Sequence, residues 1–174
     1  MSVYDMIGAD VETAGLWDPL GFSTDEPSLF RRRAVELKHG RVSMLAVVGV
    51  IVQSFVHLPH PLFSNPLPLA AFIDIWKEAA PAVMLVLVLI GVLELTVGKQ
   101  DYVDMAPGEL GGFGSIAKPV DFREWDKVQL AELKHGRLAM IAILGMLVQE
   151  QVTGEGPVEQ VIKGHVRSSF PCLP

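Results

Sequence analysis

The sequence predicts an all-α membrane protein with three transmembrane helices, of which helices one and three form a crossed pseudo-two-fold pair. Three observations predict this fold: three apolar segments, one charged motif written twice, and an uneven distribution of basic residues. Half of the 174 residues are hydrophobic and the mean hydropathy is +0.38, which favours a membrane protein. The alternative, three core helices of a soluble protein, is disfavoured because the second segment has no polar face.

The apolar segments run over residues 42–58, 79–93 and 138–148. Each is shorter than the roughly 20 apolar residues that a transmembrane helix needs. We expect the helices to continue through their charged approaches, which gives spans of about 31–57, 75–98 and 124–152 in a single domain of residues 1–174. The polar groups in these charged approaches must be paired or bound to a ligand, because lipid offers them no hydrogen-bond partner.

The basic residues indicate how the spans are oriented. Of the 14 Lys and Arg residues, 11 precede the first apolar segment or lie between the second and the third. Basic residues mark the side that is not translocated, so the N-terminus is expected on that side. Helices one and three then run parallel, as in a repeat related by an axis along the membrane normal. The net charge of -6 gives no support for nucleic-acid binding.

The charged motif reads ELKHGRVSMLA at residues 36–46 and ELKHGRLAMIA 96 residues later, at residues 132–142. Ionisable groups at membrane depth are costly, so they are candidate functional residues and each needs a partner. We expect crossed pairs, Glu36 with Arg137 and Glu132 with Arg41, each bidentate and each leaving a carboxylate oxygen free for a metal. Four glycines are expected to permit close helix approach or a flat ring laid on the backbone: Gly40, Gly49, Gly136 and Gly145.

Helical spacing places further donors beside these pairs. Glu36 and His39 share a helix face, and Gln53 returns to nearly that face about 21 Å further along the axis. The second copy repeats the set as Glu132, His135 and Gln149. Each is a good single axial donor to a large planar metal complex, whereas a bare ion needs several converging ligands. Structural salt bridges without a cofactor are the alternative, but they leave the histidines and glutamines unexplained.

The two motifs resemble helices one and three of the chlorophyll-binding light-harvesting antenna family. The middle span ends in Leu93-Glu94-Leu95 as in that family, and the segment WDPLGF at residues 17–22 is also similar. The resemblance covers about residues 15–153. Lys38, Lys134, Gln53 and the short loops are more similar to the chlorophyll a/c antennae of algae with red-lineage plastids than to the chlorophyll a/b proteins of green plants.

The resemblance implies a multi-pass protein of the chloroplast thylakoid membrane that transfers excitation energy to a photosystem. It implies axial ligands to chlorophyll magnesium at Glu36, His39, Glu94, Glu132, His135 and Gln149, with Gln53 as a further pigment-binding residue. Arg41 and Arg137 would form structural ion pairs. The implied cofactors are chlorophyll a, chlorophyll c and carotenoids of the fucoxanthin or peridinin type, with a diadinoxanthin-like xanthophyll. The implied partners are a photosystem core, neighbouring antenna subunits and thylakoid lipids.

Other functions stay open at this point. A photoprotective relative that dissipates excitation could sense acid through Glu150, Glu155 and Glu159. A small transporter gated by an intramembrane ion pair would need oligomers to enclose a pathway. We expect no enzyme, because the sequence offers no nucleophile–base pair or redox thiol. Glu94 lacks an obvious arginine partner, so a liganded Glu94 is expected to be either protonated or assisted by Lys99.

Overall fold

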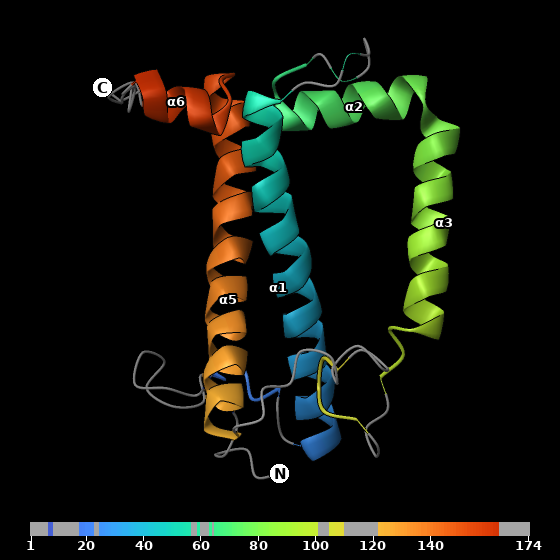
Figure 1. Ribbon diagram of the computed structural model, residues 1–174, viewed down its shortest axis with the longest axis vertical. Helices are drawn as coiled ribbons and strands as arrows, with labels where there is room; N and C mark the ends of the chain where they lie inside the picture. The colour runs from blue at the N-terminus through green and yellow to red at the C-terminus, as the bar shows by residue number, and fades with distance from the viewer. Residues whose placement is uncertain are drawn as a thin grey trace. The chain divides into compact units, whose positions relative to one another are not determined.

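The computed structural model describes residues 7–8, 18–22, 25–56, 59, 63, 65–100, 105–109 and 122–163. These residues form helices and connecting turns, with no strand among them. In chain order the helices are α1 (Glu26–Phe55), α2 (Pro68–Glu78), α3 (Ala80–Thr96), α5 (Phe122–Thr153) and α6 (Pro157–Lys163) (Figure 1). The all-α class predicted from the sequence is therefore confirmed for the described residues.

Helices α1 and α5 run unbroken through the charged approaches into the apolar segments, as expected. The middle segment differs, because the single helix expected over residues 75–98 is divided at Ala79 into α2 and α3, which are bent by 104°. Pro81 contributes to this break, since it has no backbone N–H with which to continue the hydrogen bonds of α2. Among the described residues no single helix has both the length and the apolarity to cross a membrane, whereas α2 and α3 taken together could, by length and composition.

Two compact units make up the chain. The first consists of Met1–Met44 with Ile90–Met140, and the second of Leu45–Leu89 with Ile141–Pro174. Helices α1, α3 and α5 each contribute residues to both units. The basic residues are concentrated in the first unit, which carries 11 of the 14, whereas the second holds Lys77, Lys163 and Arg167.

In the first unit, α1 and α5 lie against each other at Gly40 and Gly136 (Figure 1). A Cβ atom added to Gly40 would lie 3.0 Å from the Cα of Gly136, and one added to Gly136 would lie 3.1 Å from the Cα of Gly40. The two backbones therefore touch where a side chain would hold them apart. The described residues of this unit include four buried apolar residues, two alanines and two leucines: Leu29, Ala34, Leu133 and Ala139.

In the second unit, Glu150 of α5 caps the start of α2. Its carboxylate oxygens accept hydrogen bonds from the backbone N–H of Leu69 at 2.9 and 3.1 Å, and Oε1 also accepts one from Ala70 at 3.3 Å. The first N–H groups of a helix have no partner within the helix, and a carboxylate also complements the helix dipole there. Glu150 is only 3% exposed, so its role in this unit is structural.

Replacing Glu150 by Ala leaves the first N–H groups of α2 without these acceptors in a part-buried position. We expect Glu150→Ala to lower the free energy of unfolding by about 1–2 kcal/mol, the cost of losing a helix cap. A denaturant titration of the protein in detergent, followed by circular dichroism, measures this. The control is Ser54→Ala at the matching position of the repeat, where the hydroxyl only donates to Val50 O of its own helix. Equal effects of the two substitutions would contradict a capping role.

Candidate functional site

The two copies of the motif are joined by two crossed ion pairs between α1 and α5 in the first unit. Arg41 Nε donates to Glu132 Oε1 at 2.6 Å, and Arg137 Nε donates to Glu36 Oε1 at 2.7 Å. All four side chains are about one-third exposed. The pairs thus connect the residues expected from the sequence, but each uses one guanidinium nitrogen, so the expected bidentate geometry is absent from the described contacts.

The second guanidinium nitrogen of each arginine contacts a glycine carbonyl instead. Arg41 Nη1 donates to Gly108 O at 2.6 Å, and Arg137 Nη1 donates to Gly8 O at 3.1 Å. Both glycines are buried and have positive φ angles, +81° and +93°. Each also packs on the leucine of a motif, Gly108 on Leu37 and Gly8 on Leu133, so closely that an added Cβ would overlap the side chain.

Sequence reasoning missed these glycines. The only signal was the turn dipeptide Pro107-Gly108, and a backbone carbonyl has no residue type by which a sequence pattern could identify it. The contacts extend the two-fold relation beyond the helices, because each arginine joins a glutamate of the other helix to a turn elsewhere in the chain.

The two glutamates differ in their remaining oxygen. Glu36 Oε2 accepts a hydrogen bond from Arg33 Nη1 at 3.0 Å, and the Arg33 side chain is 11% exposed. Glu132 Oε2 receives no hydrogen bond from the described residues. The difference follows from the sequence, because Gln129 occupies the position in the second copy that Arg33 occupies in the first. Glu132 therefore has an oxygen available to a metal, whereas that of Glu36 is engaged.

Both motif histidines are exposed and have the same arrangement. The Nδ1 of His39 lies 2.9 Å from Val35 O, and that of His135 lies 2.7 Å from Ala131 O. A carbonyl oxygen only accepts, so each Nδ1 carries the proton and donates it. The lone pair of each Nε2 is then left for a metal, the arrangement in which a hydrogen bond orients a histidine ligand.

The matched glutamines lie in the second unit. Gln53 Nε2 donates to Asn65 O at 3.2 Å, which leaves the amide oxygen of Gln53 as an available donor atom. Gln149 is exposed on α5. Gly49 and Gly145, also 96 residues apart, face open space, because a Cβ at either would have no atom within 4 Å. Of the four glycines singled out from the sequence, Gly40 and Gly136 thus serve helix approach, and the other two leave the helix surface flat.

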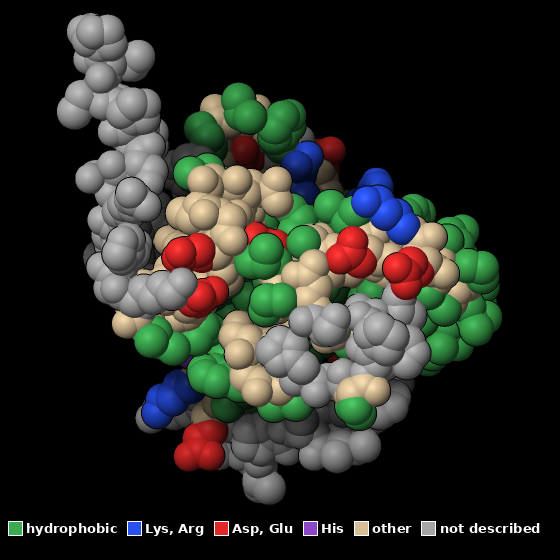
Figure 2. All heavy atoms as spheres, turned by 90° about the horizontal axis from the view of Figure 1, so that it is seen from above, with side chains coloured by type: hydrophobic (Ala, Val, Ile, Leu, Met, Phe, Trp, Pro, Cys, Tyr) green, Lys and Arg blue, Asp and Glu red, His purple; other side chains and the backbone are tan. Residues whose placement is uncertain are grey.

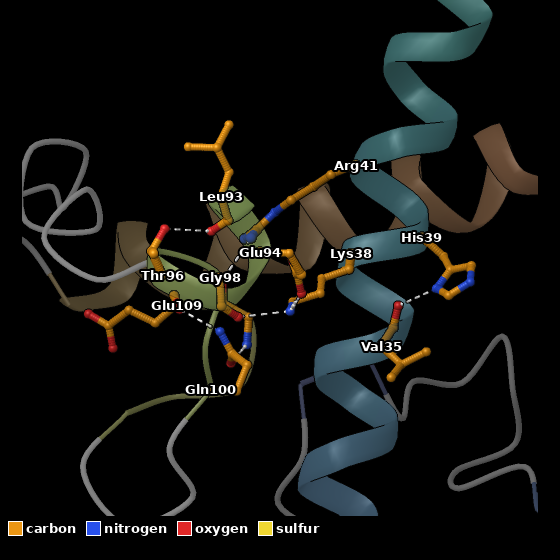
Figure 3. Close-up of polar contacts among 11 residues, drawn as sticks. Val35, Lys38, His39, Arg41, Leu93, Glu94, Thr96, Gly98, Gln100 and Glu109 are labelled. Carbon is orange, nitrogen blue, oxygen red and sulfur yellow. Dashed lines mark hydrogen bonds and ion pairs between the residues drawn. The ribbon is translucent and has the colours of Figure 1, made fainter. Parts of the chain in front are cut away.

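Glu94 near the end of α3 has a partner, but the partner is not Lys99. Lys38 Nζ donates to Glu94 Oε1 and to Gly98 O, the latter at 2.9 Å (Figure 3). Lys38 belongs to the charged motif of α1, between Glu36 and Arg41. The expectation that Lys99 assists Glu94 is therefore corrected, because the tertiary contact brings in a lysine from another helix.

Exposed apolar residues repeat along α1 and α5 in step with the motif. Four pairs spaced by 96 residues on these helices are half or more exposed: Val42 and Leu138, Leu45 and Ile141, Val48 and Leu144, and Val52 and Val148. A fifth pair, Val56 and Val152, has its first member just beyond α1. Helix α3 has no buried residue at all. Figure 2 shows hydrophobic side chains beside acidic ones on the face seen from above. Apolar surface of this extent needs a nonpolar covering.

Among the described residues, no group of three or more His, Cys, Asp or Glu side chains converges as a site for a bare metal ion. The donors are instead single and separated along the helices. His39 Nε2, His135 Nε2 and Glu132 Oε2 each present one donor atom beside exposed apolar surface. This donor set can supply single axial ligands to planar metal complexes that bring their other ligands with them.

Comparison with known proteins gives consistent matches. The family model described as chlorophyll A-B binding protein matches residues 5–151. The chain is 42% identical over 163 residues to a fucoxanthin-chlorophyll a-c binding protein of Chattonella marina var. antiqua, which covers 91% of this chain and 74% of that protein. It is 36% identical over 174 residues to fucoxanthin-chlorophyll a-c binding protein E of Macrocystis pyrifera, with 89% and 77% covered. Protein D of Phaeodactylum tricornutum is also 36% identical, over 168 residues, with 87% and 81% covered.

The turn at Gly108 provides a test of its packing on Leu37. We expect Gly108→Ala to destabilise the protein by about 1–3 kcal/mol more than Gly21→Ala, because the new methyl group overlaps Leu37. Gly21 is the matched control, since it also has a positive φ (+64°) but no atom within 4 Å of an added Cβ. Denaturation midpoints in detergent compare the two variants. If the packing argument holds, trimming Leu37 to Ala in the Gly108→Ala background recovers part of the loss. Equal midpoints for the two glycine variants would refute it.

Proposed function

This chain belongs to the chlorophyll A-B binding protein family, and we propose how its own residues hold the pigments that this membership implies. It is a light-harvesting antenna protein of the fucoxanthin–chlorophyll a/c type, and it is not an enzyme. The role of the family is to pass excitation energy to a photosystem. When bound, chlorophyll supplies the light absorption, while the protein sets the position, orientation and surroundings of each pigment.

We infer that the axial ligands to chlorophyll magnesium come from each of the long helices. Helix α1 would supply Glu36, His39 and Gln53, helix α5 would supply Glu132, His135 and Gln149, and α3 would supply Glu94. The observation that carries this proposal is the matched state of the histidines, whose Nδ1–H bonds to Val35 O and Ala131 O leave Nε2 available and exposed. The open helix surface at Gly49 and Gly145 supports it, since flat rings need such surface.

The proposed setting is the thylakoid membrane, crossed three times by spans of about 31–57, 75–98 and 124–152 in one domain of residues 1–174. The crossed pairs support this, because Arg41 and Arg137 neutralise Glu132 and Glu36 at the start of the apolar segments. The basic residues before the first span and between the second and third spans support one orientation, with the N-terminus on the side that is not translocated.

We propose chlorophyll a, chlorophyll c and fucoxanthin as the pigments, with a diadinoxanthin-like xanthophyll in addition. The names of the relatives support fucoxanthin and chlorophylls a and c, and they give no support to peridinin. Carotenoids are held by packing, and the exposed apolar residues repeated along α1 and α5 offer such surface. For the exposed apolar surface that pigments leave uncovered, the proposed partners are thylakoid lipids, a photosystem core and neighbouring antenna subunits.

The photoprotective alternative has less support. It relied on Glu150, Glu155 and Glu159 as acid sensors, and Glu150 is buried where it caps α2. A capping carboxylate already has a structural reason to be present.

Pigment loading tests the proposal. The protein refolded with chlorophyll a, chlorophyll c and fucoxanthin should show chlorophyll a emission excited through fucoxanthin and chlorophyll c bands. His39→Leu and His135→Leu should each lose the chlorophyll ligated there, as measured by pigment-to-protein ratio, because leucine has no donor atom. His39→Gln is the control, since its amide oxygen can replace the imidazole. A refolded protein that binds no pigment would refute the proposal, and full retention of chlorophyll in both leucine variants would refute the ligand roles of the histidines.

The engagement of Glu36 by Arg33 predicts that the two glutamate sites are unequal. We expect the chlorophyll at Glu36 to dissociate faster in detergent than that at Glu132, because coordination must displace Arg33 from Oε2. Exchanging the matched residues, as Arg33→Gln and Gln129→Arg, should reverse the order. Timed pigment release, with each site identified by its Glu→Ala variant, measures the two rates. An order unchanged by the exchange would show that Arg33 is not the cause.

A further inference from the structure

The charge of Glu94 is compensated by a residue of another helix, as are the charges of the two motif glutamates. Lys38 Nζ donates to Glu94 Oε1 and also to Gly98 O, which follows the last turn of α3 (Figure 3). One lysine of α1 thus holds both the side chain of Glu94 and the backbone just beyond α3. The Lys38 side chain is 28% exposed and that of Glu94 is 53% exposed.

A second contact reinforces this arrangement. Gln100 lies just beyond Gly98; its Nε2 donates to Glu109 O at 2.7 Å, and its Oε1 accepts from Gly108 N at 2.9 Å. The carbonyl of Gly108 in turn accepts from Arg41 Nη1. Lys38 and Arg41 are three residues apart on α1, so they share a face of that helix. The segment after α3 is therefore held at two points by α1 (Figure 3).

The geometry leaves the other oxygen of Glu94 available. Glu94 Oε2 receives no hydrogen bond from the described residues, and it lies beside Gly98, where an added Cβ would overlap the carboxylate. Gly98 thus provides the space into which this oxygen projects. Because Lys38 holds Oε1, the carboxylate of Glu94 cannot rotate freely. The orientation of Oε2 is therefore restricted as well.

We propose that Lys38 is a positioning residue that makes Glu94 competent as a chlorophyll ligand. The proposal rests on the ligand role of Glu94 proposed above. It assigns to Lys38, for the middle helix, what Arg137 and Arg41 do for Glu36 and Glu132. Each carboxylate is neutralised by a cation from a different helix, because an unpaired carboxylate at membrane depth is costly and a mobile one is a poor ligand. Glu94 resembles Glu132 in that its second oxygen receives no hydrogen bond from the described residues, whereas the second oxygen of Glu36 accepts one from Arg33.

Pigment loading of lysine variants tests the proposal. Lys38→Met keeps the length of the side chain but removes its charge and donors, and it should lose the chlorophyll held at Glu94. Lys38→Arg should retain that chlorophyll, since it restores a cation and donors. The matched control is Lys134→Met, the same substitution in the second copy, which should also retain it. The readouts are the chlorophyll-to-protein ratio and the 77 K absorption difference from the unsubstituted protein.

Glu94→Ala separates this proposal from the ligand assignment on which it rests. Loss of the same absorption band in Glu94→Ala and Lys38→Met, but in neither control, would support the proposal. Retention of that band in Lys38→Met but its loss in Glu94→Ala would overturn the role of Lys38 and leave Glu94 as a ligand. Retention in Glu94→Ala would overturn both, while antenna function is judged separately from the unsubstituted protein. Continued energy transfer from fucoxanthin in Lys38→Met shows that the variant has folded.

Discussion

The crossed arginine–glutamate pairs are the interaction on which the rest of the site depends. They neutralise the charges of α1 and α5 where the apolar segments begin, and no apolar environment would accept those charges singly. The direct contact of Gly40 with Gly136 lets the helices approach closely enough for side chains of this length to meet. Because each arginine uses Nε for the glutamate, its Nη1 is left to hold a turn at Gly8 or Gly108. Helix packing, the compensation of charges and the positions of the two turns therefore depend on one another.

Much of this could be predicted from the sequence because the motif occurs twice. Two copies of the same charges at membrane depth predict that they pair with each other, and the spacing of His39 and Gln53 predicts a shared helix face. The contacts of Gly8 and Gly108 could not be predicted, since they involve backbone carbonyls, which every residue has. The partner of Glu94 could not be predicted either, because the contact with Lys38 depends on how the end of α3 meets α1 and not on any local spacing. The break at Ala79 was missed because the helix was expected to begin in residues 75–78 and to continue into the apolar segment that starts at Ala79, although Pro81 was visible.

The two copies of the repeat differ at positions next to the proposed pigment sites. Arg33 corresponds to Gln129, and so one motif glutamate has both oxygens engaged while the other has one available. Ser54 corresponds to Glu150, and only the glutamate caps a neighbouring helix. If the two copies of the repeat were identical, the two pigments of each related pair would have the same surroundings. The differences give each proposed site its own charge and packing, which is how a protein tunes a bound chromophore.

Compensation of each glutamate by a cation from another helix links pigment binding to helix packing. Glu36, Glu94 and Glu132 each pair with a residue of a neighbouring helix, so the carboxylates proposed as ligands are positioned only when the helices are assembled. The protein itself buries little: no large side chain among the described residues is less than 2% exposed, and exposed apolar residues repeat along both long helices. Pigments bound to the assembled state but not to the separated helices would stabilise that state by mass action. Pigments would therefore cover apolar surface that the described residues leave exposed, and the ion pairs would ensure that they bind to one arrangement of helices.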